Sequence, residues 1–170
     1  MNSNQYAIAQ LNQMSRQEFT AVLGEVWEET PEIARQAWYS KPFADLTALN
    51  EAMVAVVNNM SDKEQLTLIR AHPDLGSKAK MADASVQEQA GLGLNRLSSQ
   101  EYERFQSLNQ RYKNKFGFPF IIAVKYHTKD SILEAFETRL KNTWEREKQQ
   151  ALAEISKIAR LRLESLTQIK

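Results

Sequence analysis

The chain contains no cysteine, and it has few glycines and prolines. Without thiols it cannot form disulfides, cysteine-ligated zinc sites, iron–sulfur clusters or a thiolate nucleophile. The 5 glycines and 4 prolines are spread over 170 residues, and most of them fall between segments with helical periodicity. We therefore expect a compact helical protein, long enough to form a core of its own.

An excess of one charge and a long apolar run are also absent. The 22 Lys and Arg residues balance 21 Asp and Glu residues, so the net charge of +1 gives no reason to expect a nucleic-acid partner or an anionic membrane. No run approaches the roughly 18 apolar residues of a membrane span. The polar start, Met1-Asn2-Ser3-Asn4-Gln5, lacks the pattern of a signal peptide. We expect a cytoplasmic protein with neither nucleic acid nor membrane as a partner.

Helix-start signals recur along the chain. A capping box places Ser, Thr or Asn three residues before Glu, and each example here precedes apolar residues with helical spacing. The pairs with this spacing are Ser15 and Glu18, Ser61 and Glu64, Ser98 and Glu101, and Asn142 and Glu145. Further helices can begin at Pro31, Asp45 and Ser131, and the last should run from about Trp144 to about Leu166. The pattern predicts an all-α fold in a single domain, residues 1–170.

One apolar segment, residues 116–124, breaks the helical pattern. It reads Phe-Gly-Phe-Pro-Phe-Ile-Ile-Ala-Val, with β-branched residues and an internal proline. No partner strand is evident, so we expect an extended segment that threads the helical core. Its irregular backbone needs hydrogen-bond partners, which either a polar ligand or neighbouring loops could supply.

His72 is one of only two histidines. It follows a segment with helical spacing, residues 62–70, and Pro73 disfavours helical backbone at the residue before it. We therefore expect the helix to end at or just before His72. An imidazole suits proton transfer near neutral pH. On position alone, the simpler interpretation is a helix-end residue without a chemical role.

Ser85 and Glu88 also have capping-box spacing, in the run Ser85-Val86-Gln87-Glu88-Gln89. The simplest interpretation is another helix start. The first turn of a helix offers N–H groups and a positive dipole end to an anionic or carbonyl group, so the structural and functional interpretations are compatible.

Arg162 falls within the apolar stripe of the last predicted helix, between Ile155 and Ile158 on a helical wheel. Arg160 falls outside that stripe, among charged residues. A buried guanidinium is costly without a partner, so we expect Arg162 to meet a carboxylate or a ligand. The alternatives are a structural salt bridge and a side chain that snorkels to solvent from the edge of the stripe.

Metal and nucleotide sites are not supported by the sequence. His127 lies in a polar connection far from His72, and no histidine or carboxylate cluster has metal-ligand spacing. The glycines form no phosphate-binding loop. We expect no metal and no organic cofactor.

Four motifs together have the pattern of a known family. They are Ala71-His72-Pro73-Asp74-Leu75, Ser85-x-x-Glu88-Gln89-x-Gly91-Leu92, Lys115-Phe116-Gly117-Phe118-Pro119-Phe120-Ile121 and Leu161-Arg162-Leu163. On these motifs, which occur in order along nearly the whole chain, the protein resembles the OHCU decarboxylases. That family acts on 2-oxo-4-hydroxy-4-carboxy-5-ureidoimidazoline (OHCU) late in urate degradation.

The resemblance implies a helical, cofactor-free carboxy-lyase, often a homodimer, that converts this small molecule into (S)-allantoin and carbon dioxide. His72 would be the proton donor, and Glu88 and Arg162 would be the other catalytic residues. The implied substrate-binding residues are Pro73, Ser85, Val86, Gln87, Gln89, Phe120, Ile121, Ile122, Ala123 and Val124. From the residues alone, two alternatives stay open: a cofactor-free hydrolase or isomerase of a related ureido or imide ring, and a helical binding module without catalysis.

Overall fold

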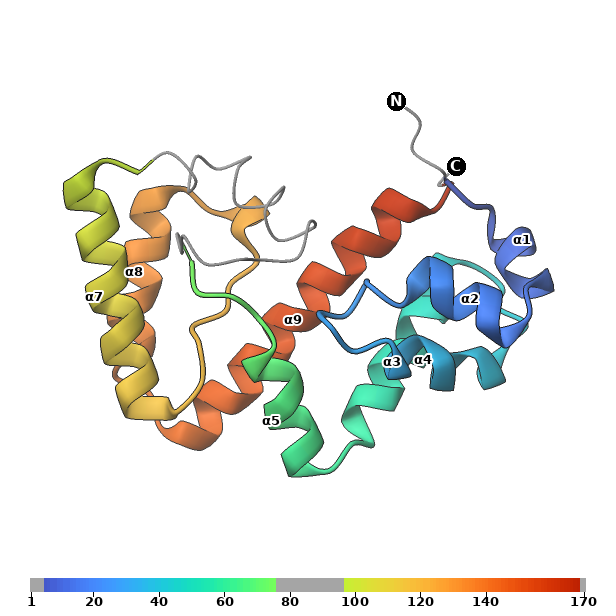
Figure 1. The fold of residues 1–170 in the computed structure, drawn as a ribbon, viewed down its shortest axis with the longest axis horizontal. Coiled ribbons are helices and arrows are strands. Elements are labelled where there is room, and N and C mark those ends of the chain that lie inside the picture. The colour runs from blue at the N-terminus through green and yellow to red at the C-terminus, as the bar shows by residue number, and fades with distance from the viewer. Residues whose placement is uncertain (1–4, 76–96, 169–170) are drawn as a thin grey trace. The chain divides into compact units, whose positions relative to one another are not determined.

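The computed structural model describes residues 5–75 and 97–168, most of which are helical (Figure 1). The β pairing found in these two ranges is one isolated bridge, between Tyr6 and Thr167. The predicted all-α class is confirmed.

The backbone clusters into two compact units. The first comprises Met1–Leu68 and Ser156–Lys170, and the second comprises Ile69–Ile155. Two helices, α5 (Asp62–Arg70) and α9 (Trp144–Leu166), contribute residues to both. The single domain over residues 1–170 stays a prediction.

The first unit is built from short helices around an apolar core. α3 packs against both α2 and α4. Phe19, Leu23, Ile33, Leu49 and Met53 are fully buried there. In order, its elements before α5 are α1 (Ile8–Gln13), α2 (Arg16–Leu23), α3 (Glu32–Ala37), the 3₁₀ helix η1 (Trp38–Ser40) and α4 (Leu46–Asn58).

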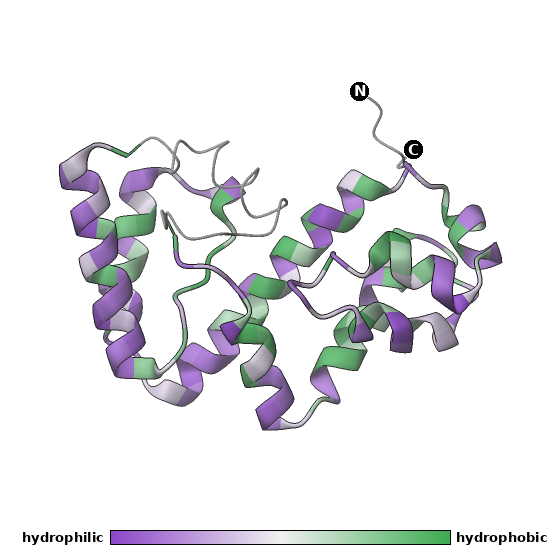
Figure 2. Cartoon of the chain, in the orientation of Figure 1, coloured by the Kyte–Doolittle hydropathy of each residue, from purple (hydrophilic) through white to green (hydrophobic). Residues whose placement is uncertain are grey.

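The second unit contains α7 (Ser99–Phe116), the 3₁₀ helix η2 (Val124–Tyr126) and α8 (Lys129–Arg139). Figure 2 shows hydrophilic and hydrophobic residues mixed along α7 and α8, as expected of helices that bury one face. Aromatic rings fill the core beside them. Phe120 stacks on Phe136 with ring centroids 3.8 Å apart, and Tyr112 meets Phe120 edge-on at 5.3 Å. The interior of this unit therefore joins α7 and α8 to the segment between them.

Local capping explains where most of the helices begin. Ser15 and Ser98 each accept a hydrogen bond from the N–H of the glutamate three residues on, whose carboxylate accepts from the serine N–H in return. Ser61 and Glu64 make the same reciprocal pair, and Asp45 caps α4. These predicted helix starts are confirmed.

The last helix, α9, runs from Trp144 to Leu166 as predicted, but the predicted capping residues of α9 and α8 are wrong by one and three residues. α9 is capped by Thr143, whose hydroxyl accepts from the N–H of Arg146, whereas the Asn142 amide donates to Glu147. α8 is capped by Thr128, and Ser131 occupies the third helical position of that capping box. In both cases a nearby threonine caps the helix. The residue predicted to be the cap, Asn142 or Ser131, makes a different hydrogen bond.

The predicted extended segment is confirmed, but it is slightly shorter than expected. Phe116 is the last residue of α7 and Val124 the first of η2, so residues 117–123 make the connection. Every residue from 118 to 124 is buried.

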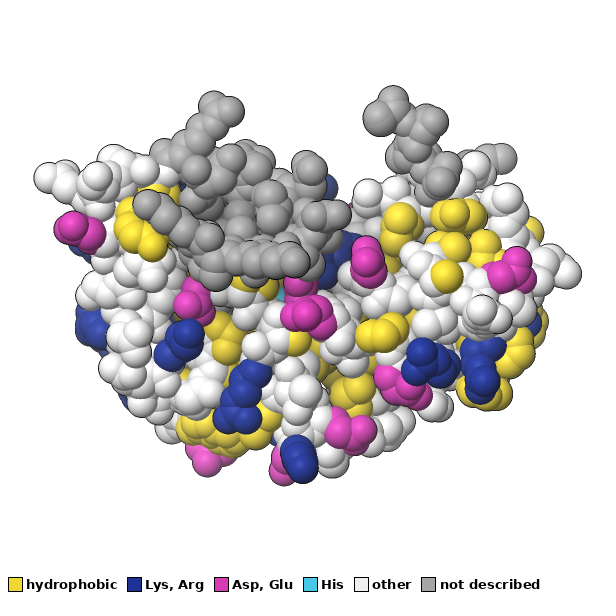
Figure 3. Space-filling model, viewed as in Figure 1, with side chains coloured by type: hydrophobic (Ala, Val, Ile, Leu, Met, Phe, Trp, Pro, Cys, Tyr) yellow, Lys and Arg dark blue, Asp and Glu magenta, His cyan; other side chains and the backbone are white. Residues whose placement is uncertain are grey.

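No helix in the described ranges is long and apolar enough to cross a membrane. On the face drawn in Figure 3, basic and acidic side chains are interspersed. This agrees with the balanced composition.

Candidate functional site

His72 lies two residues beyond the end of α5. The helix ends at Arg70, and the His72 N–H donates to the carbonyl of Ile69 at 3.2 Å. The predicted helix end is therefore confirmed. His72 is only 8% exposed. A nearly buried imidazole is shielded from bulk water, so its protein or ligand contacts decide which nitrogen carries the proton.

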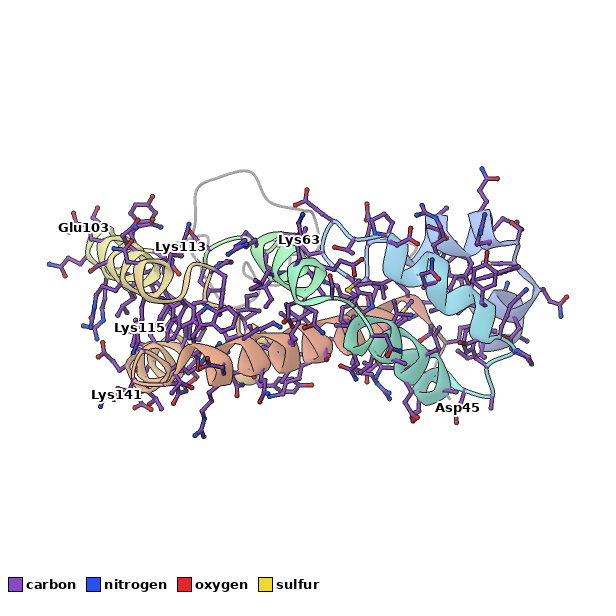
Figure 4. The ribbon with its side chains drawn as sticks, turned by 90° about the horizontal axis from the view of Figure 1, so that it is seen from below. Asp45, Lys63, Glu103, Lys113, Lys115 and Lys141 are labelled. Carbon is purple, nitrogen blue, oxygen red and sulfur yellow. The ribbon has the colours of Figure 1, made fainter. Side chains whose placement is uncertain are left out.

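The residues after His72 are fastened to α7. The Asn109 amide donates to the Leu75 carbonyl at 2.9 Å, and Lys113, labelled in Figure 4, pairs with Asp74 at 3.2 Å. Asn109 and Lys113 are four residues apart, so they lie on one face of the helix. Lys113 is 44% exposed, and exposed ion pairs contribute little. The buried bond from Asn109 is therefore the stronger of the two contacts.

Gly117 links the His72 region to the extended segment. Its carbonyl accepts a hydrogen bond of 3.1 Å from Nε of Arg70, two residues before His72. Gly117 ends α7 in the left-handed conformation, with φ of 79°. Residues with a Cβ rarely adopt this conformation, so a glycine is required to turn the chain here.

Charged side chains hold two successive peptide units of the extended segment. Arg139, at the end of α8, donates from Nη1 to the carbonyl of Ile121 at 2.7 Å. Glu154, on α9, accepts from the N–H of Ala123 at 2.9 Å. Arg139 is 7% exposed and Glu154 4%, so both bonds are shielded from water. The partners of this backbone are side chains of two helices, and neither interpretation made from the sequence had included them.

These two bonds determine the direction of the backbone groups of Ile122. In a trans peptide unit, the C=O and the N–H point in opposite directions. Because Arg139 binds the Ile121 carbonyl, the Ile122 N–H is directed away from Arg139. Because Glu154 binds the Ala123 N–H, the Ile122 carbonyl is directed away from Glu154. Within the described ranges, neither of these Ile122 groups has a hydrogen-bond partner.

A buried polar network supports Arg139. Its Nε pairs with Glu147 at 2.8 Å, and its guanidinium lies 4.3 Å from the ring centre of Phe120. Glu147 also accepts from the Tyr112 hydroxyl at 2.5 Å and from the Asn142 amide at 2.7 Å. Burial and the bond to Glu147 raise the pKa of Tyr112 far above its ordinary value, so Tyr112 stays a neutral donor. A buried ion pair is tolerated where hydrogen bonds satisfy its remaining atoms, as they do here.

Arg162 is buried in the first unit, where it pairs with a carboxylate. It is 8% exposed, its Nη2 lies 3.1 Å from Oε1 of Glu28, and its Nη1 donates to the Val26 carbonyl at 3.3 Å. Arg160 is 35% exposed and pairs with Glu164. The predicted contrast between the two arginines is confirmed. The salt bridge interpretation of Arg162 gains a definite partner, and its catalytic role stays a prediction.

The remaining candidates are distributed unevenly. Ser85, Val86, Gln87, Glu88 and Gln89 lie outside the described residues, so their predicted roles stay predictions. Pro73 follows His72 directly, and the candidate residues Phe120, Ile121, Ile122, Ala123 and Val124 are all buried in the same unit as His72. That unit therefore brings together the His72 region and the extended segment.

In the described part of the chain, no group of three or more His, Asp or Glu side chains could hold a metal ion. His127 instead has its Nδ1 2.9 Å from the Ser131 hydroxyl, next to the start of α8.

Sequence reasoning missed the two anchors of the extended segment, Arg139 and Glu154, and the carboxylate of Glu147 that pairs with Arg139. A weak signal was present, because Arg139 falls on the same helical face as Ile132 and Phe136, and Glu147 lies four residues before Ala151. A charged residue within the apolar face of a helix indicates a buried partner. From the sequence, we infer such a partner for Arg162 alone.

Known proteins match this chain over most of its length. The family model described as OHCU decarboxylase matches residues 12–164. The chain is 45% identical, over 160 residues, to a protein of Halalkalicoccus jeotgali named 2-oxo-4-hydroxy-4-carboxy-5-ureidoimidazoline decarboxylase. The match covers 94% of this chain and 91% of that protein.

Two further matches concern a longer protein and a solved structure. The uric acid degradation bifunctional protein of Bacillus subtilis is 45% identical over 93% of this chain, which spans 32% of that protein. A crystal structure titled OHCU decarboxylase in the presence of (S)-allantoin superposes with a TM-score of 0.69 at 25% identity. The superposition covers 90% of this chain and 98% of the chain in that crystal structure. This chain belongs to the OHCU decarboxylase family.

Proposed function

We propose that this protein is a cofactor-free carboxy-lyase that decarboxylates OHCU to (S)-allantoin in urate degradation. The observation that carries the proposal is the family match over residues 12–164. Two structural features support it. His72 is nearly buried and lies just before Leu75, whose carbonyl is held by α7, and the neighbouring segment has Ile122 peptide groups that are directed away from the side chains anchoring it.

The substrate itself supplies the electron sink. Its carboxylate leaves as carbon dioxide from a ring carbon that also carries a hydroxyl. The electron pair of the broken C–C bond forms a new C=C bond, while the adjacent C=N bond passes its pair to nitrogen, which takes a proton. The hydroxyl then loses its proton and becomes the carbonyl of the product, while the C=C pair takes up a proton at the neighbouring carbon. No pyridoxal or thiamine group is needed to hold the charge.

We assign delivery of the carbon-bound proton to His72. Protonation from one side gives one enantiomer, so the donor must be held in place relative to the ring. The contacts of Asn109 and Lys113 just after His72, and of Arg70 just before it, support that role. Glu88 would hydrogen-bond the substrate hydroxyl, and Arg162 would guide the anionic substrate, as the family resemblance implies.

The polar ring needs donors and acceptors in a nearly dry environment. The segment from Phe120 to Val124 offers backbone groups among buried apolar side chains. Ser85 to Gln89 and Pro73 complete the proposed lining. A site of this kind, largely apolar with a few placed polar groups, suits a small neutral ring with one charged substituent.

Circular dichroism tests the reaction directly. The unstable product of urate oxidation is generated fresh and followed at the wavelengths of allantoin, with and without the protein. We expect the signal of a single enantiomer to appear much faster with the protein. One carbon dioxide should be released for each allantoin formed. The His72→Gln variant serves as the control for a catalysed reaction. Tight binding without turnover would indicate a binding module, and ring opening without carbon dioxide would indicate a hydrolase.

We further propose that the protein is cytoplasmic and forms a homodimer, as the resemblance implies. Light scattering coupled to size exclusion should give about twice the chain mass of 19.5 kDa. A mass equal to one chain at micromolar concentration would contradict the dimer.

A further inference from the structure

Opposite charges act on the two peptide units that flank the Cα of Ile122. The guanidinium of Arg139 binds the carbonyl end of the first unit, and the carboxylate of Glu154 binds the N–H end of the second. Residues 119–123 form no helix or turn, and Ala123 has extended backbone, with φ of −76° and ψ of 94°. In extended backbone the N–H and the C=O of one residue lie on the same side of the chain, so an extended Ile122 presents a donor next to an acceptor.

We propose that Arg139 and Glu154 are positioning residues that make the Ile122 N–H and C=O a recognition edge for the ureide group of the substrate. This inference rests on the proposed function, because it assigns that edge to the decarboxylation substrate. Arg139 and Glu154 thereby join the residues that serve the site, although they contact its backbone and not the substrate.

Both anchors also polarise the groups that they direct. A cation on the Ile121 carbonyl draws electron density along the peptide unit, so the Ile122 N–H at its other end becomes a stronger donor. An anion on the Ala123 N–H has the opposite effect, so the Ile122 carbonyl becomes a stronger acceptor. Hydrogen bonds that involve an ionised partner are about twice as strong as neutral ones.

The use of buried charges on neutral peptide groups supports a role beyond packing. Burying a charge is costly, and a neutral amide side chain could have satisfied the same backbone atoms. Arg139 is already compensated by Glu147, yet Nη1 is directed to Ile121. Both oxygens of Glu154 accept hydrogen bonds, one from Ala123 and the other from the Gln150 amide at 2.9 Å. Both charged groups are thus held in fixed orientations by further contacts.

The chemistry of this edge selects its ligand class. A donor and an acceptor side by side pair with a group that offers an acceptor and a donor in the reverse order. A cyclic or open ureide, with C=O next to N–H, has this arrangement. A carboxylate offers acceptors only and would face the Ile122 carbonyl unfavourably. The edge therefore holds the ureide part of the substrate and leaves its carboxylate free to depart.

One peptide unit can be observed alone by nuclear magnetic resonance. Ile121 and Ile122 are the only consecutive isoleucines in the sequence. In protein labelled with ¹³C-carbonyl and ¹⁵N isoleucine, an HNCO spectrum therefore shows a single cross-peak, which joins the Ile121 carbonyl to the Ile122 N–H. We expect (S)-allantoin to move its proton shift downfield. An unmoved cross-peak at saturating (S)-allantoin would overturn the proposal.

Isosteric variants test the two anchors. Glu154→Gln keeps an acceptor for Ala123 but removes the charge, and Arg139→Lys keeps a charge for Glu147 but lacks the fork that reaches Ile121. We expect each variant to raise KM roughly tenfold with a much smaller change in kcat, because the lost contact is made in ground and transition states alike. Arg139→Lys should also shift the Ile121 carbonyl in the free protein.

Glu137→Gln and Arg111→Lys are the matched controls, since both residues are exposed and face each other at 3.9 Å. They should leave KM and the cross-peak unchanged. If both anchor variants melt cooperatively and keep normal KM and the normal ligand-induced shift, the positioning role is wrong while the decarboxylase assignment stands. If the unaltered protein releases no carbon dioxide from OHCU, the proposed function is wrong, and the positioning role that rests on it is wrong as well. If Arg139→Lys does not fold, the Glu154→Gln result decides.

Discussion

The side-chain amide of Asn109 donates a 2.9 Å hydrogen bond to the backbone carbonyl of Leu75, and Asn109 is 1% exposed. Leu75 lies three residues after His72. The amide of one α7 residue thus fixes the backbone next to the proposed proton donor.

Asn109→Ala should lower both stability and turnover. The Leu75 carbonyl would lose its buried partner, which costs about 1–3 kcal/mol in unfolding free energy. Freer backbone at His72 should lower kcat as well. Urea unfolding and steady-state kinetics on the same sample measure both effects. Asn114→Ala is the control, because Asn114 is exposed on the same helix and contacts only Gln110 at 2.8 Å among the described residues. Normal kcat in a destabilised Asn109→Ala variant would limit Asn109 to a structural role.

His72→Gln should remove most of the rate while the fold survives. Positioned acid–base groups contribute about 10²–10⁴-fold. Glutamine fills similar space and keeps a hydrogen-bonding end but does not transfer protons. His127→Gln, the control at the other histidine, should keep near-normal turnover. Product handedness is a second readout, since loss of the donor should let solvent protonate either side and give partly racemic allantoin. Undiminished turnover in His72→Gln would move the proton-donor role to another residue.

Arg162 and Arg160 should behave differently. Arg162→Lys should lose activity if Arg162 guides the substrate, because a point charge does not replace a planar fork, which Glu28 and the Val26 carbonyl hold in one orientation. Arg160→Ala should be nearly silent, because its exposed pair with Glu164 contributes about 0.3–0.5 kcal/mol. Kinetics and thermal melts on the same variants make the comparison. A parallel loss of stability in Arg162→Lys and Glu28→Gln, with kcat/KM unchanged, would make Arg162 purely structural.

Acid should weaken the helix starts. The N–H of Ser98 holds the pKa of Glu101 below its ordinary value of 4.5, and Ser15 and Ser61 do the same for Glu18 and Glu64. A lowered pKa in the folded state stabilises the fold above pH 4.5, and this contribution disappears as the pH falls through the folded value. We expect melting temperatures to drop below that pH.

Glu101→Gln should show less of this acid loss, whereas Glu103→Gln, at an exposed α7 position, should follow the unaltered protein (Figure 4). Scanning calorimetry from pH 6 to pH 3 measures the difference between the two variants. Identical profiles for Glu101→Gln and Glu103→Gln would contradict the capping explanation.

The features that sequence predicted well are the local ones. Ser98 and Glu101 are three residues apart, so their reciprocal bonds follow from helix geometry alone. The helix end at Arg70 follows equally from Pro73. The wheel position of Arg162 predicted its burial because helical periodicity is local too, although Glu28 could not be named as its partner.

The anchors of the extended segment could not be predicted in the same way. Tyr112 and Glu147 are 35 residues apart, and Arg139 reaches back 18 residues to Ile121. With 22 basic and 21 acidic side chains in the chain, nothing local selects these pairs. Asn142 and Thr143 show a smaller failure. Both side chains can cap a helix, but Thr143 caps α9 and the Asn142 amide donates to Glu147, five residues later.

The contacts around His72 also have a consequence for synthesis on the ribosome. Its neighbours Arg70, Asp74 and Leu75 are held by residues 47, 39 and 34 positions later. While the chain is still growing, α5 can form, but the backbone that carries the histidine has none of these supports until residue 109 has left the exit tunnel, and it has all three only after residue 117. The chemical centre is thus among the later parts of this unit to be completed during translation, and a fragment that stops before α7 would contain the histidine without its supports.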